Sequence, residues 1–321
     1  LGLFWAGEIY YRLNKNDSAL NYYQSFLTAP GAFNQPEYNL THYNIGYCYF
    51  KDKKYSQALL SFQKFLLSQE NKNTELINDA YKRIADCYFI NKDINNALSY
   101  YDKSISTKLS GIDYSLFQKA IALGILKRFT EKEAVLNQLL TEYPNSNYVD
   151  DALFELADTY VMLNNNSKAI KYYSELIDNY PKSSYLVKAK LQKGLLYFNM
   201  KEDEKALECL KNVVAEYPGT PESKEALMTI QDIYIYMNKV DEFLVYVKDF
   251  KGVSNTEEDS MTYQAIELRY MKGDCNNSRT SFENYIKTFP EGIFIINAHF
   301  YKAECDYKAA ALDEALQGYD Y

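Results

Sequence analysis

The sequence has few of the residues that most often carry chemistry. Its 321 residues include two histidines, His42 and His299, which lie far apart in the chain, and five cysteines without a C-x-x-C pair. Metal sites and nucleophile–histidine pairs need their partners close together in space. No phosphate-binding or dinucleotide-binding glycine loop and no G-x-S-x-G motif occurs either. We therefore predict a protein that is not an enzyme, with no catalytic residue, no metal site and no cofactor.

Glycine and proline are also scarce, at 12 and 7 residues, which argues against a disordered or loop-rich chain. Hydrophobic residues make up 47% of the sequence and charged residues 24%, a globular composition. No apolar stretch approaches the ~18 residues that a membrane span needs. The net charge is −8 and no Lys/Arg-rich run appears, so the chain would repel a phosphate backbone. We predict no transmembrane segment and no nucleic-acid partner.

The few prolines that are present recur at a fixed interval. Tyr-Pro pairs place Pro144, Pro181 and Pro218 at steps of 37 residues. Proline cannot continue a helix because it has no N–H to donate, so each proline would end a repeated unit.

The sequence around these prolines repeats as well. A small residue is followed three positions on by tyrosine, twelve on by alanine, and sixteen on by a large apolar residue. We call the position of the small residue the small slot and count other positions from it. The small slot is occupied by Gly7, Gly46, Ala85, Ala120, Ala157, Gly194 and Ala303, with two degenerate copies centred near Gln231 and Ile266. The frame predicts nine units.

Each unit is interpreted as two amphipathic helices joined by a short polar turn. In "ALFELADTYVML", for example, Leu153, Leu156, Ala157 and Tyr160 fall at helical spacing. The small residues are expected where the paired helices cross, because a larger side chain would hold the two backbones apart.

This frame resembles the tetratricopeptide repeat family over nearly the whole chain. The resemblance implies an all-α, right-handed superhelical solenoid of about nine helix-turn-helix repeats, forming a single domain over residues 1–321. Lys132 stands where alanine is expected, and the unit around Phe243 lacks small residues, so both units should pack less regularly. We expect an irregular segment or hinge near residues 250–260.

The style of the tandem repeats is similar to that of bacterial envelope proteins. These include the periplasmic coordinator of the Tol–Pal system and the lipoprotein of the outer-membrane assembly machine. That resemblance implies a location in the periplasm or cell envelope of a bacterium. The opening "LGLFWAGEIYYRL" lacks a starting methionine, and neither end has the polar cap of a solenoid. We therefore expect a fragment of a longer protein.

Three of the cysteines share one position. Cys48, Cys87 and Cys305 each lie two residues after a small slot, on a buried helix face where cysteine acts as a compact hydrophobe. We therefore expect no disulfide, although the sequence leaves an oxidising compartment open.

In proteins of this family the first helix of each unit lines a concave groove. The groove slots are three before, one after and four after the small slot, which form one helical face. Aromatic residues and carboxylates alternate there, and these residues are predicted to bind a partner: Tyr43, Tyr47, Phe50, Asp86, Phe89, Phe117, Phe154, Asp158, Phe198, Tyr263, Glu267 and Tyr270. An equally weighted interpretation is that they serve packing within the repeats.

The leading function is an interaction scaffold that presents this aromatic and acidic groove to a protein or peptide, with an apolar or basic segment favoured. A second hypothesis is a structural spacer with an empty groove inside a longer repeat protein. A third is a carbohydrate-handling envelope component, since exposed tyrosines can stack on sugars. The sequence names no partner.

Overall fold

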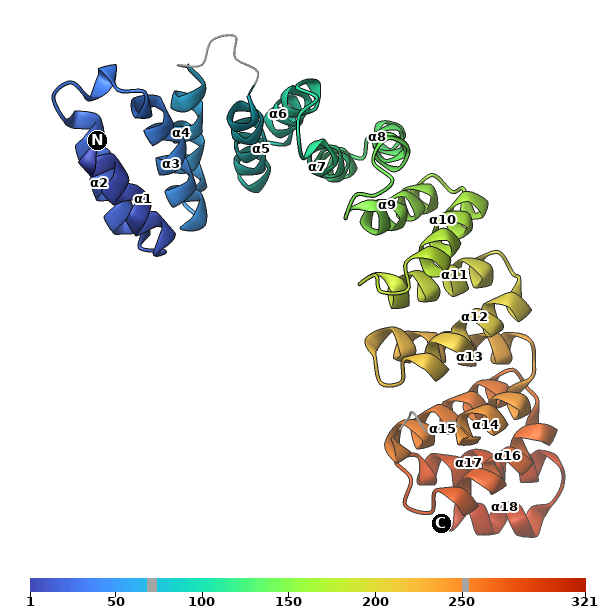
Figure 1. The fold of residues 1–321 in the computed structure, drawn as a ribbon. Helices are drawn as coiled ribbons and strands as arrows, with labels where there is room; N and C mark the ends of the chain where they lie inside the picture. Colours follow the sequence, from blue (N-terminus) through green and yellow to red (C-terminus); the bar gives the residue numbers. More distant parts are fainter. Residues whose placement is uncertain (68–73, 250–253) are drawn as a thin grey trace. The chain divides into compact units, whose positions relative to one another are not determined.

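The computed structural model describes residues 1–67, 74–249 and 254–321. In these ranges the chain forms eighteen α-helices, one short 3-10 helix and no strand, which confirms the all-α prediction (Figure 1). The chain divides into two compact units, Leu1–Ala169 and Ile170–Tyr321. Of the predicted irregular segment, residues 250–253 lie outside the described ranges, and the residues from 255 onward belong to a regular helix.

The helices follow one another in pairs, in agreement with the nine predicted repeats. The first unit contains α1 (Gly2–Arg12), α2 (Asn16–Thr28), η1 (Ala32–Asn34), α3 (Glu37–Lys51), α4 (Tyr55–Leu67), α5 (Glu75–Ile90), α6 (Ile94–Ser106), α7 (Ile112–Ile125), α8 (Phe129–Glu142) and α9 (Val149–Met162). Helix α10 (Asn166–Asn179) begins there and continues in the second unit. The second unit then contains α11 (Leu186–Asn199), α12 (Asp203–Glu216), α13 (Pro221–Tyr236), α14 (Val240–Asp249), α15 (Asn255–Met271), α16 (Cys275–Thr288), α17 (Ile295–Lys308) and α18 (Leu312–Tyr319).

The recurring prolines stop the second helix of a pair, as predicted. Helix α8 ends at Glu142 and Pro144 follows two residues later, and the same spacing separates the end of α12 from Pro218. The residues before Pro144 and Pro218 are tyrosines whose backbone has left the helical region, with φ −129° and ψ 55° at Tyr143 and φ −130° and ψ 53° at Tyr217, consistent with the restriction that proline places on its predecessor.

The small slot lies where the two helices of a hairpin cross. A Cβ atom on Gly46 would be 2.7 Å from the ring of Phe62, and one on Gly194 would be 2.7 Å from Leu210. In both hairpins the facing residue is the large apolar one sixteen positions after the slot. The alanines at this slot, such as Ala85 and Ala120, are completely buried. The predicted register of the repeats is therefore confirmed.

We expect Gly194→Leu to lower the free energy of unfolding by about 1–3 kcal/mol, the usual cost of overpacking. The new side chain would displace Leu210 and separate α11 from α12. Gly2 offers a matched control, because it is also helical but a Cβ there meets nothing within 4 Å. Gly2→Ala should leave the free energy of unfolding in urea unchanged. Equally small changes for Gly194→Leu and Gly2→Ala would contradict the register.

The turn between the helices of each hairpin has one geometry throughout. The residue seven after the slot has a positive φ angle in every hairpin, and only one of the nine, Gly273, is a glycine. Its N–H and that of the next residue bond carbonyls of the preceding helix, as when Lys53 and Lys54 bond the carbonyl oxygens of Phe50 and Tyr49. This is the Schellman ending of a helix, and it sets the direction in which the second helix returns.

The hairpin with Lys132 in place of alanine shows how the substitution is accommodated. Lys132 is buried, and its Nζ lies 2.5 Å from Glu155 on α9. Its aliphatic chain passes Gly124, where other hairpins carry a bulky residue, and a Cβ on Gly124 would lie 3.3 Å from the Lys132 Nζ. Two departures from the repeat, a lysine and a glycine, thus compensate each other.

The expectation that the cysteines are unpaired is wrong for the last hairpins. Cys275, the first residue of α16, forms a disulfide with Cys305 on α17, with Cα atoms 5.2 Å apart. Cys48 and Cys87, at the same slot as Cys305, are free and buried as predicted. The difference arises because only the hairpin before Cys305 begins its second helix with a cysteine.

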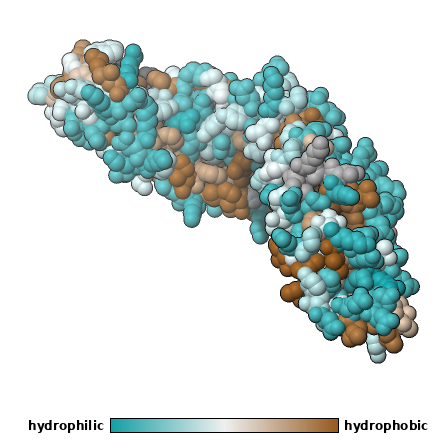
Figure 2. Space-filling model, turned by 90° about the horizontal axis from the view of Figure 1, so that it is seen from below, coloured by the Kyte–Doolittle hydropathy of each residue, from teal (hydrophilic) through white to brown (hydrophobic). Residues whose placement is uncertain are grey.

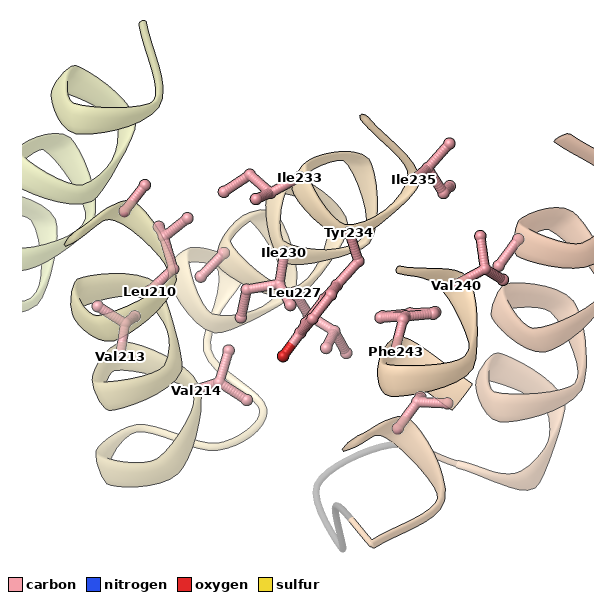
Figure 3. Close-up of a cluster of buried hydrophobic side chains, with 14 of the residues drawn as sticks. Leu210, Val213, Val214, Leu227, Ile230, Ile233, Tyr234, Ile235, Val240 and Phe243 are labelled. Carbon is pink, nitrogen blue, oxygen red and sulfur yellow. The ribbon is translucent and has the colours of Figure 1, made fainter. Parts of the chain in front are cut away.

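The hairpin around Phe243 lacks small residues but still has a closed core. Its second helix, α14, has ten residues, and Phe243 on it lies beside Tyr234 on α13 (Figure 3). Val240 of α14 and Leu227 of α13 belong to the same buried cluster. Leu210 and Val213 of α12 cover the other side of α13 in the same cluster. Gln231, in the small slot, is buried, and its side-chain amide donates to the carbonyl oxygen of Met261 on α15.

Candidate functional site on the first helices

The slot three before the small residue is used mainly for packing. Phe117, Phe154 and Tyr263, all predicted to contact a partner, are 9%, 2% and 2% exposed. The ring of Phe117 stacks on Tyr148, and that of Tyr263 stacks on Phe294 at 4.4 Å between centroids. A partner could reach these rings only if the hairpins opened, so we leave the three residues out of the proposed contact surface.

Carboxylates at the slot after the small residue have partners inside their own hairpin. Glu8 accepts a hydrogen bond of 2.5 Å from the hydroxyl of Tyr23, and Asp86 accepts one of 2.9 Å from Tyr101. In both cases the tyrosine lies fifteen residues later, on the second helix. A buried phenol needs an acceptor, so these acids stabilise the fold. Glu267 differs, because it accepts from Tyr263 on its own helix.

These bonds give the protein a defined sensitivity to alkaline pH. Burial first, and the neighbouring carboxylate second, raise the pKa of Tyr23 and of Tyr101 above the ordinary value. The neutral phenol is therefore favoured in the folded state, and its contribution to stability is complete below the unfolded pKa of about 10. As pH rises above that value the contribution is lost.

We accordingly expect constant stability between neutral pH and about pH 9, then a fall above about pH 10, the pKa of an unfolded tyrosine. Ultraviolet absorbance should show the exposed tyrosines ionising first. The buried tyrosines should ionise only at the pH at which the circular dichroism of the helices is lost. A single transition of all tyrosines in folded protein would contradict the assignment. Tyr101→Phe should reduce the loss of folding stability at alkaline pH. It should leave the ultraviolet titration of the exposed tyrosines unchanged.

Four of the predicted residues gather around an arginine that the pattern of slots did not indicate. Arg83, on α5, forms a 2.7 Å ion pair with Asp86 and lies 3.7 Å from Asp79. Its guanidinium also covers the rings of Phe50 and Tyr114, at 5.7 and 5.5 Å from their centroids.

Tyrosines from neighbouring hairpins complete this Arg83 cluster. The hydroxyl of Tyr43 donates to Asp79 at 2.8 Å, and Tyr47 donates to the same oxygen. Tyr114 donates to Asp86 at 2.8 Å. Helices α3, α5 and α7 are thereby joined by one polar network.

The network compensates the charge of Asp86, one of the carboxylates that were expected to attract a basic partner. Burial raises the pKa of Asp86, and Arg83 with two tyrosine hydroxyls opposes that rise. Lys82 lies 3.9 Å from Asp79. This part of the first helices is therefore a compensated ion cluster rather than an acidic patch. Arg83 occupies the position two before the small slot, which is not one of the predicted groove slots.

In each of the two units, the slot four after the small residue holds mostly partly exposed side chains near the ends of the first helices, although Ile235 is buried. Of the predicted residues, Phe50, Phe89, Phe198 and Tyr270 are half-buried there. Lysines cover some of the rings: Lys308 lies 5.1 Å from the centroid of Tyr270 and Lys201 lies 5.6 Å from that of Phe198. The remaining predicted residue, Asp158, is also half-buried.

The face shown in Figure 2 is largely hydrophilic, and its apolar side chains lie in separate patches. Tyrosine does not count among the hydrophobic residues on this scale, so the patches mark aliphatic residues, phenylalanine and methionine. The two histidines contribute no site here, since His42 packs edge-on against Tyr38 and His299 stacks on Tyr321.

Over residues 1–67, 74–249 and 254–321, His, Cys, Asp and Glu side chains form no group of three that could hold a metal ion. None of the helices in these same ranges is both long and apolar enough to cross a membrane.

Comparison with known proteins identifies the repeats. Models of the tetratricopeptide repeat match residues 6–75, 79–109, 151–183 and 188–220, more than half of the chain. No curated protein sequence matches.

Among solved structures, a tetratricopeptide repeat protein from Parabacteroides merdae ATCC 43184 has 16% identity and a TM-score of 0.52, covering 83% of this chain and 97% of its own. The C-terminal part of a repeat-containing protein from Cytophaga hutchinsonii has 10% identity and a TM-score of 0.56, covering 92% and 98%. At such low identity these similarities bear on the fold alone.

Proposed function

Because the chain belongs to the tetratricopeptide repeat family, we propose that it is a non-enzymatic scaffold that holds a segment of a protein partner against the first helices of its hairpins. Within a unit, the partner would lie along the side chains four positions after the small slot. One observation carries this choice: the aromatic rings at that slot are half-buried or exposed, whereas the rings three before the small slot are largely buried and acids one after it accept hydrogen bonds.

The partner segment proposed is apolar rather than basic. Phe50, Phe89 and Phe198 offer rigid rings that lose little conformational freedom on binding. The acids that would have favoured a basic segment accept hydrogen bonds already, as Asp86 and Glu267 do. A cation replacing those bonds would have to break them first.

We also propose that the protein works in an oxidising compartment, such as the periplasm or envelope of a bacterium. The Cys275–Cys305 disulfide supports this, because disulfides persist in such compartments and are rare in reducing ones. Mass spectrometry of protein isolated from its native cell, with free thiols blocked at lysis, tests the point. A reduced pair in native protein would contradict it.

Two other functions are weighed against the scaffold. A spacer would have the same fold but no ligand on the first helices. A sugar-binding surface would combine exposed rings with Asn, Asp and Arg, and the Arg83 cluster brings half-buried rings together with Asp and Arg. Its polar atoms bond one another, however, so few are left for sugar hydroxyls, and we do not adopt this function.

The scaffold is tested by photo-crosslinking in the native cell. A photoreactive phenylalanine analogue replaces Phe89 or Phe198, and in the controls it replaces Leu60 or Val245, which are exposed on second helices. We expect a discrete polypeptide adduct from the first pair only. Adducts from none of the four sites, or equally from all, would leave the spacer standing and remove the scaffold. Thermal melting checks that each variant folds.

A further inference from the structure

A second slot for small residues exists in the first helices, five positions before the small slot. Its side chain packs toward the preceding hairpin, and it is completely buried in seven hairpins: Thr41, Ala80, Ser115, Ala152, Ala189, Ala226 and Ala298. In α15 the same slot holds Met261, which is only half-buried. The side chain of Met261 borders a cavity between α13 and α15.

Gln231 lies close to Met261. It fills the small slot of α13 with a long side chain, and its amide donates to the backbone carbonyl of Met261. Both residues line a cavity of about 370 Å³ between α13 and α15.

The cavity has an apolar floor and a polar rim. Leu227 and Met261 form the floor, which continues into the core of Figure 3, and Met228 stands at the mouth with 56% of its surface exposed. Gln231, Gln264 and Ser260 line the rim. At one end Lys224 and Glu257 form a 2.8 Å ion pair.

This lining selects the chemistry of an occupant. Among the described residues that line the cavity, the charged ones are Lys224 and Glu257, and they compensate each other, so neither sign of ligand charge is favoured. None of these described lining residues is aromatic, which removes the surface on which a sugar would stack. Methionines adapt their shape to aliphatic groups. The rim amides can bond a peptide backbone, whereas an alkyl chain would leave them unused.

We propose that the cavity between α13 and α15 binds a single leucine or methionine side chain of a partner polypeptide, whose backbone bonds the amides of the rim. The site rests on the proposed scaffold function and makes it more specific: one aliphatic side chain fixes the register of the bound segment. Its volume, at the lower end of the range for ligand pockets, suits one such side chain with its backbone.

The test uses the whole chain labelled with ¹³C at its methionine methyl groups, of which there are six. The probes are short peptides of glycine, serine and asparagine with one central guest residue. Leucine and methionine guests should shift the signals of Met228 and Met261 in a saturable way. A peptide with an alanine guest should bind at least about tenfold more weakly, the usual effect of removing apolar groups from a pocket. Lysine and glutamate guests should leave the signals unchanged.

Matched variants locate the effect. Met228→Glu should abolish the response of the Met261 methyl group. Met271 lies on α15 together with Met261 and is about as exposed as Met228, so Met271→Glu should leave that response intact. A response to a detergent alkyl chain but not to the peptides would overturn the proposal. So would a response that survives Met228→Glu. If the peptides move no methionine signal while Phe89 and Phe198 still crosslink a polypeptide, the pocket assignment fails and the scaffold stands.

Discussion

Replacing Asp86 with alanine is expected to lower the free energy of unfolding by about 3–5 kcal/mol, the cost of removing one partner of a buried ion pair. The substitution leaves Arg83 with its nearest carboxylate, Asp79, at 3.7 Å. It also removes the acceptor of two tyrosine hydroxyls, those of Tyr101 and Tyr114. Because each of these groups is largely withdrawn from water, none can recover its lost bond from solvent.

An exposed pair with the same spacing provides the control. Arg128 and Glu131 are also three residues apart and 2.5 Å from each other, but both lie at the surface. Glu131→Ala should therefore change the urea midpoint little. The double replacement Arg83→Met with Asp86→Leu should recover part of the loss, since apolar residues can substitute for a buried pair. Equal urea midpoints for Asp86→Ala and Glu131→Ala would show that the Arg83 cluster contributes no more to folding stability than an exposed ion pair.

Removing the disulfide is the second large effect expected. Cys275 and Cys305 close a loop with a sequence separation of 30. The chain-entropy account gives about 3–4 kcal/mol for a loop of this size. Cys275→Ser together with Cys305→Ser should therefore destabilise the second unit, and hydrogen exchange should accelerate most in α16 and α17.

Cys87 is the matched control for Cys305, because it occupies the same slot and is equally buried but unpaired. Cys87→Ala should cost only the small cavity left by one sulfur atom. Reductant should lower the denaturation midpoint of the native protein to that of the double variant and leave the variant itself unchanged. Insensitivity of the native protein to reductant would contradict a stabilising disulfide.

The fold could be predicted from the sequence because its determinants are short-range and repeated. Gly46 and Gly194 identify the crossing of two helices, since the residue that fills the space stands sixteen positions later in both hairpins. The prolines identify where the second helices stop. Each of these signals depends on residues within one hairpin, so periodicity alone suffices to locate them.

The contact surface was harder to predict because it depends on what the next hairpin covers. Helical periodicity places Phe154 and Phe198 on one face, but it does not say which of them a neighbouring hairpin buries. The acids' role as hydrogen-bond acceptors within a hairpin could, in contrast, have been predicted from the sequence. Each of the four repeats with tyrosine sixteen after the slot has an acid one after it: Glu8 with Tyr23, Asp86 with Tyr101, Asp158 with Tyr173, and Glu304 with Tyr319. That pairing predicts a hydrogen bond within the hairpin rather than a charge offered to a partner.

The Arg83 cluster also bears on how the chain folds. Among its links between neighbouring hairpins, that of Tyr43 with Asp79 joins residues 36 apart, and within a hairpin that of Tyr101 with Asp86 joins residues 15 apart. Closing such short loops costs little chain entropy, and proteins dominated by local contacts fold quickly. Each hairpin depends on its immediate neighbours alone, so structure can begin at any well-packed hairpin and spread along the chain in both directions. A lesion at Asp86 would then interrupt that spread locally, leaving distant hairpins to form at their own rate.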